Sequence, residues 1–288
     1  MKLGVVFPQT EIGADPGIIK AYAQTAEALG YDYLLAYDHV LGANPERPGG
    51  WQGPYTYQHI FHEPFVLFAY LAGLTHKLEL VSGVIILPQR QTALVAKQAA
   101  QVDVLSGGRL RLGVGLGWNK VEYEALNMIF TNRGRRIEEQ VTLLRALWTK
   151  PLVDFKGRDH SIPDAGINPL PVQRPIPIWF GGMAEPALRR AARLGDGWMP
   201  NSASEERLKA LLEQMRGYLE AEGRDPQKFG IDGRISIANR PQNEWASQVE
   251  MWRALGATHV AVNTMGAGLK SPQDHIEAIR RFKATISG

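Results

Sequence analysis

Three glycines at alternate positions end a β-rich run and precede a helix-forming segment. In RLRLGVGLGWNKVEYEALN, residues 109–127, they are Gly113, Gly115 and Gly117. A Rossmann dinucleotide-binding loop needs its third glycine three residues after the second, and an acidic residue about 20 residues further on. Here the third glycine follows the second by two residues and Trp118 comes next, so the spacing disfavours such a loop. At a barrel mouth, Gly113 and Gly115 would let a flat ring or a backbone approach closely, or would serve strand twist and close packing alone.

An acid and an imidazole stand together where another predicted strand ends. The segment YDYLLAYDHV, residues 31–40, carries Asp38 and His39. Adjacent strand residues face opposite sides, so only one of the pair is expected to point squarely into a barrel mouth. Because an imidazole exchanges protons near neutral pH, His39 is the candidate catalytic residue for proton transfer near a cofactor ring. The alternative is a histidine that only bonds the following loop.

Two positions are candidates for holding an anion. Gly181 and Gly182 directly precede a helix predicted to begin near residue 184. Free backbone N–H groups and the helix dipole make such a turn a phosphate site, although an ordinary strand-to-helix turn has the same sequence. Arg90 ends the third predicted strand, where it would either make a forked contact with a phosphate or carboxylate or lie in solvent.

The loop over residues 41–62, LGANPERPGGWQGPYTYQHIFH, is richer in aromatic residues than a solvated loop. Its candidate substrate-lid residues are Trp51, Tyr55, Tyr57, His59, Phe61 and His62. A dimer contact is the alternative role for this loop. His59 and His62 have the i, i+3 spacing of metal ligands, but no third histidine or paired carboxylate is evident nearby, so no metal site is expected.

The elements that must position these residues alternate between strands and helices. Strands are predicted at 2–7, 31–40, 78–88, 109–115, 175–182, 196–200, 230–238 and 258–263. Helices are predicted at 17–29, 63–75, 91–106, 120–127, 132–149, 184–194, 204–222, 242–254 and 273–286. Eight strand–helix units with near-continuous apolar strands favour a single (β/α)8 TIM barrel over a doubly wound sheet.

One domain is expected over residues 1–288, with two insertion segments at 41–62 and 150–174. Both exceed the usual length of connections in compact α/β units. By strand order they are expected to leave the C-terminal ends of strands 2 and 4, the rim where barrel active sites are built.

Composition excludes several classes of function. The net charge is +3 and the pI about 9.0, yet no block of Lys and Arg resembles a nucleic-acid stripe, so no nucleic-acid partner is expected. The absence of cysteine rules out disulfides, thiolate metal sites and thiol nucleophiles. There is no apolar run of 18 residues, and Pro8, Gln9 and Glu11 come too early for the apolar core of a signal peptide. A cytoplasmic protein without a membrane partner is therefore expected.

Three long segments of the chain resemble the luciferase-like monooxygenase family. They are LVSGVIILPQRQTALVAKQAAQVDVLSGGRLRLGVGLGWNKVEYEAL, RGRRIEEQVTLLRALW and IPIWFGGMAEPALRRAARLGDGWMP. Within that family the chain is most similar to the oxidoreductases that depend on the deazaflavin coenzyme F420. The likeness runs from the first strand to about residue 200, and beyond it only the strand–helix alternation supports the family.

The resemblance implies a barrel with an isoalloxazine-type ring in its mouth. It implies a non-proline cis peptide at Val84–Ile85 in a bulge that backs the ring, and it places Asp38 and His39 near the deazaflavin head. Further implied cofactor-binding residues are Trp118 and Asn119 beside the ring or its ribityl chain, and Gly181, Gly182 and Met183 at the phosphate.

The function expected from the resemblance is hydride transfer between F420 and a small organic substrate. The sugar-phosphate dehydrogenases of the group carry a glutamate proton donor directly after the position of Gly115, where this chain has Leu116. A sugar phosphate is therefore not the expected substrate, and the proton donor stays open. The alternatives are an FMN-dependent monooxygenase that uses O2 and a reductase partner, and a flavin-binding barrel without turnover. The family is commonly dimeric, so a homodimer is expected.

Overall fold

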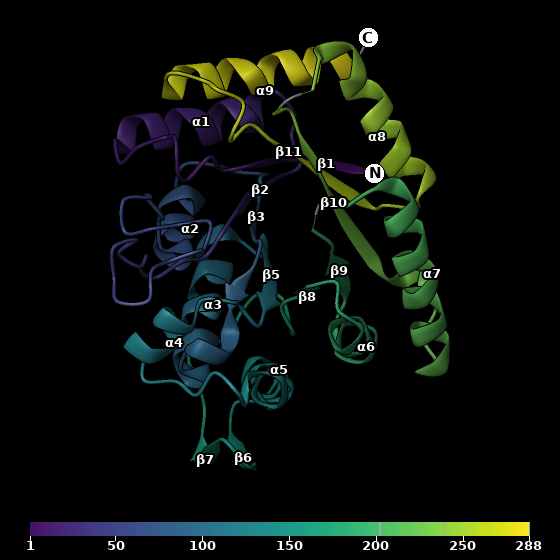
Figure 1. Cartoon of the computed structure of the whole chain (residues 1–288). Coiled ribbons are helices and arrows are strands. Elements are labelled where there is room, and N and C mark those ends of the chain that lie inside the picture. The colour runs from purple at the N-terminus through teal and green to yellow at the C-terminus, as the bar shows by residue number, and fades with distance from the viewer. Residues whose placement is uncertain (202, 239, 288) are drawn as a thin grey trace.

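The computed structural model describes residues 1–201, 203–238 and 240–287, and its strands form a closed parallel barrel (Figure 1). The barrel strands are β1 (Lys2–Val6), β2 (Tyr33–Ala36), β3 (Glu79–Ser82), β4 (Ile85–Ile86), β5 (Leu110–Gly115), β8 (Ile178–Gly181), β9 (Gly197–Met199), β10 (Gly230–Ser236) and β11 (His259–Asn263). They pair in the order β3-β2-β1-β11-β10-β9-β8-β5-β4, and β3 also pairs with β5, which closes the ring. Because β3 and β4 are two pieces of one predicted strand, the barrel has eight strand positions. The predicted (β/α)8 barrel is therefore confirmed.

Helices surround the strands on the outside, as Figure 1 shows. They are α1 (Pro16–Ala28), α2 (Pro64–Ala72), α3 (Thr92–Ser106), α4 (Lys120–Ala125), α5 (Arg133–Thr149), α6 (Glu185–Leu194), α7 (Glu205–Ala221), α8 (Trp245–Ala254) and α9 (Pro272–Ser287). Short 3-10 turns are η1 (Leu87–Gln89), η2 (Pro226–Lys228) and η3 (Gln242–Glu244). The apolar faces of the α-helices pack on the strands and bury one large core, in which Trp148 and Trp198 are fully enclosed.

Local signals place the helix ends close to their predicted positions. Asp15 caps α1 by accepting hydrogen bonds from the backbone N–H groups of Gly17 at 2.7 Å and Ile18 at 3.1 Å, and Pro16 takes the first helical position. Gly107 ends α3 with a left-handed φ of 68°, a conformation that a residue with a Cβ adopts only at a cost.

The predicted continuous strand 78–88 is interrupted in the structure. It consists of β3, a bend, β4 and η1, and the non-proline cis peptide lies at Gly83–Val84, one bond before the expected Val84–Ile85. A Cβ at Gly83 would lie 2.5 Å from the side chain of Leu35, so only glycine fits at the bend. The local pattern alone predicts one strand, because both pieces are buried; its one sign of the interruption is Gly83, since a glycine inside a strand is typical of a bulge.

The two insertion segments have different positions. Segment 41–62 follows β2, contains a bridge between Ala43 and Thr56, and ends where α2 begins. Segment 150–174 begins only after α5 and forms an antiparallel hairpin of β6 (Val153–Lys156) and β7 (Ser161–Ala165) beyond that helix (Figure 1). It contacts α3, α5 and, through Gln173, the start of β5. It contributes no residue to the lining of the cavity at the barrel mouth, contrary to the expectation that it leaves the rim after strand 4.

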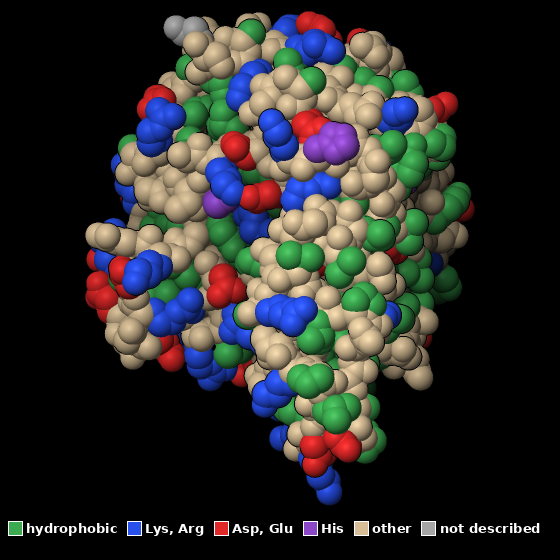
Figure 2. Space-filling model, turned by 180° about the vertical axis from the view of Figure 1, so that it is seen from behind, with side chains coloured by type: hydrophobic (Ala, Val, Ile, Leu, Met, Phe, Trp, Pro, Cys, Tyr) green, Lys and Arg blue, Asp and Glu red, His purple; other side chains and the backbone are tan. Residues whose placement is uncertain are grey.

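The surface carries mixed charge. On the face shown in Figure 2, Lys and Arg are interspersed with Asp and Glu rather than gathered into one stripe. Over the described ranges, the structure has no helix with both the length and the apolar character needed to span a bilayer.

Candidate active site

A cavity of about 800 Å³ opens at the C-terminal ends of the barrel strands. Each of the eight strand positions, or the loop that follows it, contributes lining residues, from Thr10 after β1 to Gly266 after β11. This is the end of a TIM barrel at which active sites are found. Its size is that of a pocket for a cofactor or a drug-sized ligand.

Val84 forms part of the cavity wall, and two glycines make room for it. A Cβ at Gly115 would lie 2.6 Å from Val84 Cγ2, and a Cβ at Gly181 would lie 3.0 Å from Val84 Cγ1. Carbon atoms in contact normally stay about 3.5–4.0 Å apart, so neither position accepts a larger residue without movement. The glycines therefore admit the Val84 side chain, which in turn faces the cavity.

Gly113 does not reach the cavity. A Cβ there would overlap the backbone oxygen of Ser82 and lie 2.7 Å from the sulfur of Met199. Gly113 thus allows close strand packing, which corrects the expectation that a ring approaches it directly. Ile85 is also fully buried and outside the cavity lining, so the expected contact with a cofactor is not supported for it either.

His39 lines the cavity and is paired with a carboxylate. Its Nδ1 lies 3.1 Å from Oε1 of Glu122, a residue of α4 that is only 1% exposed. The same oxygen accepts hydrogen bonds from the backbone N–H groups of Val40 at 2.8 Å and Leu41 at 3.4 Å. This geometry, a histidine held by a carboxylate on one nitrogen, leaves Nε2 available for a bound molecule.

Sequence reasoning missed Glu122. It lies 83 positions after His39, and its only visible signal is an acidic residue in the first turn of the helix that follows the glycine run. That signal is typical of any helix start, because an acidic side chain there stabilises the helix dipole.

Asp38 and Arg90 belong to a clamp rather than to a free anion site. Asp38 accepts the backbone N–H of Ile86 at 2.9 Å and is paired with Arg90 at 2.8 Å. Arg90 also binds Glu63 at 2.9 Å, immediately before α2. Burial lowers the pKa of Arg90, but the charges of Asp38 and Glu63 outweigh it and raise the pKa overall. Arg90 is absent from the cavity lining, which corrects its expected contact with a cofactor, whereas Asp38 does line the cavity.

Both Asp38 and His39 line the cavity, although strand alternation allowed only one of them to face it. The reason is that β2 ends at Ala36, before either residue. The alternation of side chains across a strand therefore does not apply at positions 38 and 39.

The turn between β8 and α6 borders the cavity at Gly181, Gly182 and Met183. Gly182 has a φ of 109°, a conformation suited to glycine, and its oxygen accepts the Trp198 indole N–H at 2.7 Å. Sequence reasoning missed Arg133, at the start of α5, which lines the same cavity and stacks on Phe130 at 3.7 Å from the ring centroid. A helix N-terminus and a guanidinium in one cavity are suited to a phosphate.

Two aromatic residues of segment 41–62, together with Trp118, surround His39. Its ring centroid lies 4.9 Å from that of Tyr55, 4.8 Å from that of Phe61 and 5.5 Å from that of Trp118. Tyr55, His59 and Trp118 line the main cavity. Trp51 is not in the lining, but its ring packs 5.7 Å from that of Trp118.

The remaining predicted residues lie around the site. A second cavity of about 270 Å³ is bordered by His39, Tyr55, Tyr57, His59, Phe61 and Asn119, among others. Asn119 is buried and caps α4 by accepting the backbone N–H of Val121 at 3.0 Å. It is not among the residues that line the main cavity. His62 packs against Phe7 and bonds the backbone oxygen of Gly13 at 3.0 Å, which places it outside both cavities.

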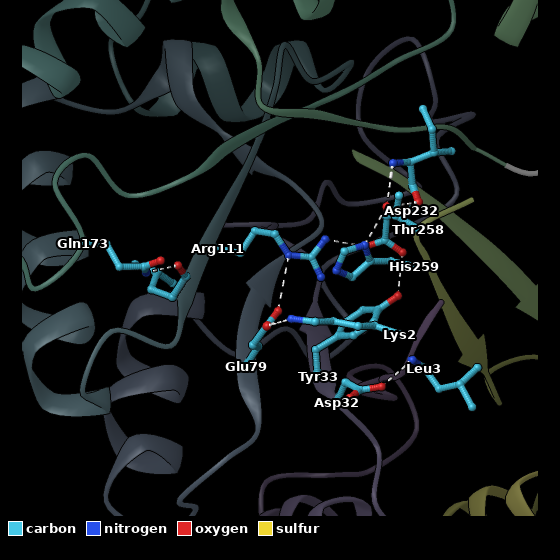
Figure 3. A network of polar contacts seen from close by, with 12 residues as sticks. Lys2, Leu3, Asp32, Tyr33, Glu79, Arg111, Gln173, Asp232, Thr258 and His259 are labelled. Carbon is cyan, nitrogen blue, oxygen red and sulfur yellow. Dashed lines mark hydrogen bonds and ion pairs between the residues drawn. The ribbon is translucent and has the colours of Figure 1, made fainter. Parts of the chain in front are cut away.

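A polar network lies in the barrel toward the N-terminal ends of the strands (Figure 3). Asp232 of β10 is fully buried, accepts the Tyr33 hydroxyl at 2.6 Å and is paired with Arg111 at 3.1 Å. The Arg111 guanidinium lies 4.8 Å from the Tyr33 ring centroid and 4.3 Å from that of Trp179. Burial, together with the charge of Arg111, lowers the pKa of His259 to about 3, so this histidine is neutral near pH 7.

Comparisons with known proteins identify the family of the chain. The family model for luciferase-like monooxygenases matches residues 1–283. An uncharacterised protein of Mycobacterium tuberculosis is 37% identical over 208 residues, which cover 70% of this chain and 71% of that protein. An FMNH2-dependent dimethylsulfone monooxygenase of Pseudomonas fluorescens is 29% identical over 94% of this chain and 72% of its own length. An F420-dependent glucose-6-phosphate dehydrogenase of Amycolatopsis mediterranei is 30% identical over 70% of this chain and 58% of its own length.

Two solved structures share the fold. The monooxygenase RslO1 of Streptomyces bottropensis has a TM-score of 0.80 at 18% identity, with 100% of this chain and 99% of that chain covered. The coenzyme F420-dependent tetrahydromethanopterin reductase of Methanopyrus kandleri has a TM-score of 0.77 at 15% identity, with 99% and 98% covered. At these identities the structures establish the architecture alone. With the family model matching nearly the whole barrel, the chain belongs to the luciferase-like monooxygenase family, which contains both F420-dependent and FMN-dependent enzymes.

Proposed function

We propose that this protein is an oxidoreductase that transfers a hydride between coenzyme F420 and a small organic substrate. The observation that carries the proposal is the cavity itself. It joins a ring-sized space beside Val84 and His39 to a phosphate-suited turn at Gly181–Met183. The similarity to an F420-dependent dehydrogenase supports the choice of coenzyme.

The residues present fit such a coenzyme. Val84 offers an apolar surface against which a flat ring packs, and the glycines at 115 and 181 keep that surface in place. Gly182, Met183 and Arg133 would hold the phosphate by backbone N–H groups and a guanidinium. When bound, F420 supplies the hydride chemistry, and the protein contributes orientation, exclusion of water and electrostatics.

His39 is the residue that we propose holds or moves the proton. Its Nδ1 faces Glu122, so the proton exchanged with a substrate or a ring is the one at Nε2. The buried Glu122 carboxylate fixes the orientation of the imidazole. The aromatic residues of segment 41–62 and Trp118 enclose the imidazole and limit the access of water.

FMN-dependent monooxygenation is the second candidate function. It is supported by the dimethylsulfone monooxygenases, whose similarity extends over 94% of this chain, more than that of the F420-dependent dehydrogenase. The space beside Val84 and the turn at Gly181–Met183 would serve either coenzyme, because FMN also has a tricyclic ring and a phosphate. In that case O2 and a reductase partner would be required.

Titration of the purified protein with each coenzyme tests the choice. We expect a saturable change in absorbance with F420 at micromolar or lower concentrations, and weaker binding of FMN. Binding of FMN without binding of F420 would overturn the proposal in favour of the second candidate. The proposal also includes a homodimer, which sedimentation analysis of the same sample tests directly.

A further inference from the structure

Three hydrogen-bond donors lie together in the cavity on strands β10 and β11. Arg234 and Ser236 of β10 and Asn263 of β11 all line it. Arg234 and Ser236 alternate along β10 with the core residue Ile235, so both face the barrel interior. Ser236 and Asn263 are register partners on adjacent parallel strands, so the three side chains form one continuous surface, here called the donor patch.

Arg234 is fixed in place before any ligand binds. Its Nη1 donates to the backbone oxygens of Gly233 at 2.8 Å and Asp232 at 3.2 Å, and it is also paired with the Asp232 carboxylate. The side chain is only 12% exposed. Because these bonds use one terminal nitrogen, the rest of the guanidinium plane is left for Tyr37 and a bound molecule. A preorganised cation of this kind binds an anion without a large ordering cost.

The charges around Arg234 do not balance. The connected cations are Lys2, Arg111 and Arg234, and the connected carboxylates are Glu79 and Asp232. His259 adds no charge, because burial and Arg111 lower its pKa to about 3. The connected groups therefore carry one positive charge in excess. Arg234 is the cation among them that lines the cavity, and because its side chain is only 12% exposed, its attraction for an anion is stronger than in water.

The other two donors have their acceptor atoms occupied. Asn263 Oδ1 accepts the backbone N–H of Met265 at 3.0 Å, which leaves its NH2 group as a donor. Ser236 Oγ accepts the backbone N–H of Ala238 at 3.3 Å, which leaves its hydroxyl hydrogen to donate. Together with Arg234 they present donors from three side chains to one ligand.

A carboxylate on the same cavity wall is already engaged. Glu11 Oε1 accepts the backbone N–H of Gly266 at 2.8 Å, and its Oε2 lies 3.2 Å from His275 Nε2. These bonds hold Glu11 against the loop after β11 and partly offset its repulsion of an anion.

We infer that the donor patch binds the oxyanion group, a carboxylate or sulfonate, of a small organic substrate. Met199, Met265 and Val84 line the same cavity and provide apolar contacts for the remainder of such a molecule. The assignment to a substrate rests on the proposed function, whereas the existence of an anion site rests on the donor patch alone.

The test compares methanesulfonate with methanesulfonamide, which has nearly the same shape and no charge at pH 7. Each is titrated by calorimetry at low ionic strength into the F420-loaded protein, and into the protein alone. We expect methanesulfonate to bind at least tenfold more tightly, and Arg234→Met to reduce its affinity at least tenfold. Arg234→Lys, which keeps the charge, should retain part of it, and Ser236→Ala should lose less than Arg234→Met. Arg216→Met, on the exposed surface of α7, is the matched control and should leave the affinity unchanged.

Equal affinity for the two probes, or full methanesulfonate affinity in Arg234→Met, would overturn the inference. If Arg234→Met weakens F420 binding but not methanesulfonate binding, the donor patch belongs to the coenzyme and the substrate assignment is wrong. If F420 does not bind, yet methanesulfonate binds in an Arg234-dependent way, the proposed function fails while the anion site stands. A melting curve for each variant, with Ser236→Ala as the milder change, separates lost binding from lost folding.

Discussion

Enlarging Gly115 by one methyl group should displace Val84 and narrow the space proposed for the coenzyme ring. In Gly115→Ala the new Cβ would lie 2.6 Å from Val84 Cγ2. Normal carbon contacts are about 3.5–4.0 Å, so one of the two groups must move by about 1 Å. The cavity is the open side of the wall, and Val84 is expected to move into it.

The size of the effect follows from known costs of overpacking. An extra methyl group in a packed site destabilises a protein by about 1–3 kcal/mol. For a chain of this length each kcal/mol lowers Tm by about 2 °C, so we expect a fall of about 2–6 °C. Because a displaced Val84 occupies the space of the ring, we expect the Kd for F420 to rise at least about tenfold, which corresponds to about 1.4 kcal/mol.

A double-mutant cycle identifies the cause. Val84→Ala removes the methyl groups that the new Cβ would meet, so the variant with both changes should recover F420 affinity and much of the Tm relative to Gly115→Ala alone. Gly217→Ala is the control, because a Cβ there has no neighbour within 4 Å and the residue lies inside α7. It should be neutral or slightly stabilising. The reasoning is refuted if Gly115→Ala binds F420 and melts like the wild type, or if adding Val84→Ala restores neither F420 affinity nor Tm. The contact between these residues would then not determine the space for the ring.

Three further outcomes are expected. His39→Ala should lower the rate of hydride transfer by about 100-fold or more while the Kd for F420 stays within about tenfold, because the phosphate is held elsewhere; a wild-type rate would end the catalytic role. Glu122→Gln keeps an oxygen for the bonds that Glu122 Oε1 accepts but removes the charge, so the loss of about 1.5–3 kcal/mol should lower kcat by about 10- to 150-fold with little change in KM. The exposed Glu124→Gln on the same helix is its control, and equal kcat values in the two variants would refute the positioning role. The pKa of His259 is lowered to about 3 on folding, so its contribution to stability is present above about pH 6.5 and is lost as the pH falls toward 3. The Tm of His259→Gln should therefore fall less than that of the wild type between pH 7 and pH 4, as measured by calorimetry.

The barrel could be predicted from the sequence because its signals are local. Alternating apolar strands and amphipathic helices recur along the whole chain, and helix ends are marked by residues such as Asp15 and Gly107. The bulge near Gly83 was expected only from the family resemblance, and its position was wrong by one bond, because the contact that restricts residue 83 is with Leu35 on the neighbouring strand. Distances across a barrel are set by register, which a single run of letters does not contain.

Candidate site residues were harder to predict for the same reason. The glycines at 113 and 115 have the same local pattern, yet one meets a backbone oxygen and the other meets Val84. Arg90 ends a strand, as an anion-binding arginine would, but its partners Asp38 and Glu63 come from other parts of the chain. Glu122 and Arg234 acquire their positions only when distant elements meet at the barrel mouth.

The clamp of Asp38, Arg90 and Glu63 links two walls of the cavity. Glu63 directly follows segment 41–62, and Asp38 holds the backbone of Ile86, two residues after Val84. The clamp therefore connects the end of the aromatic segment to the bend that carries Val84. We therefore expect a ligand that shifts this segment to alter the environment of Val84 as well, although the two do not touch directly.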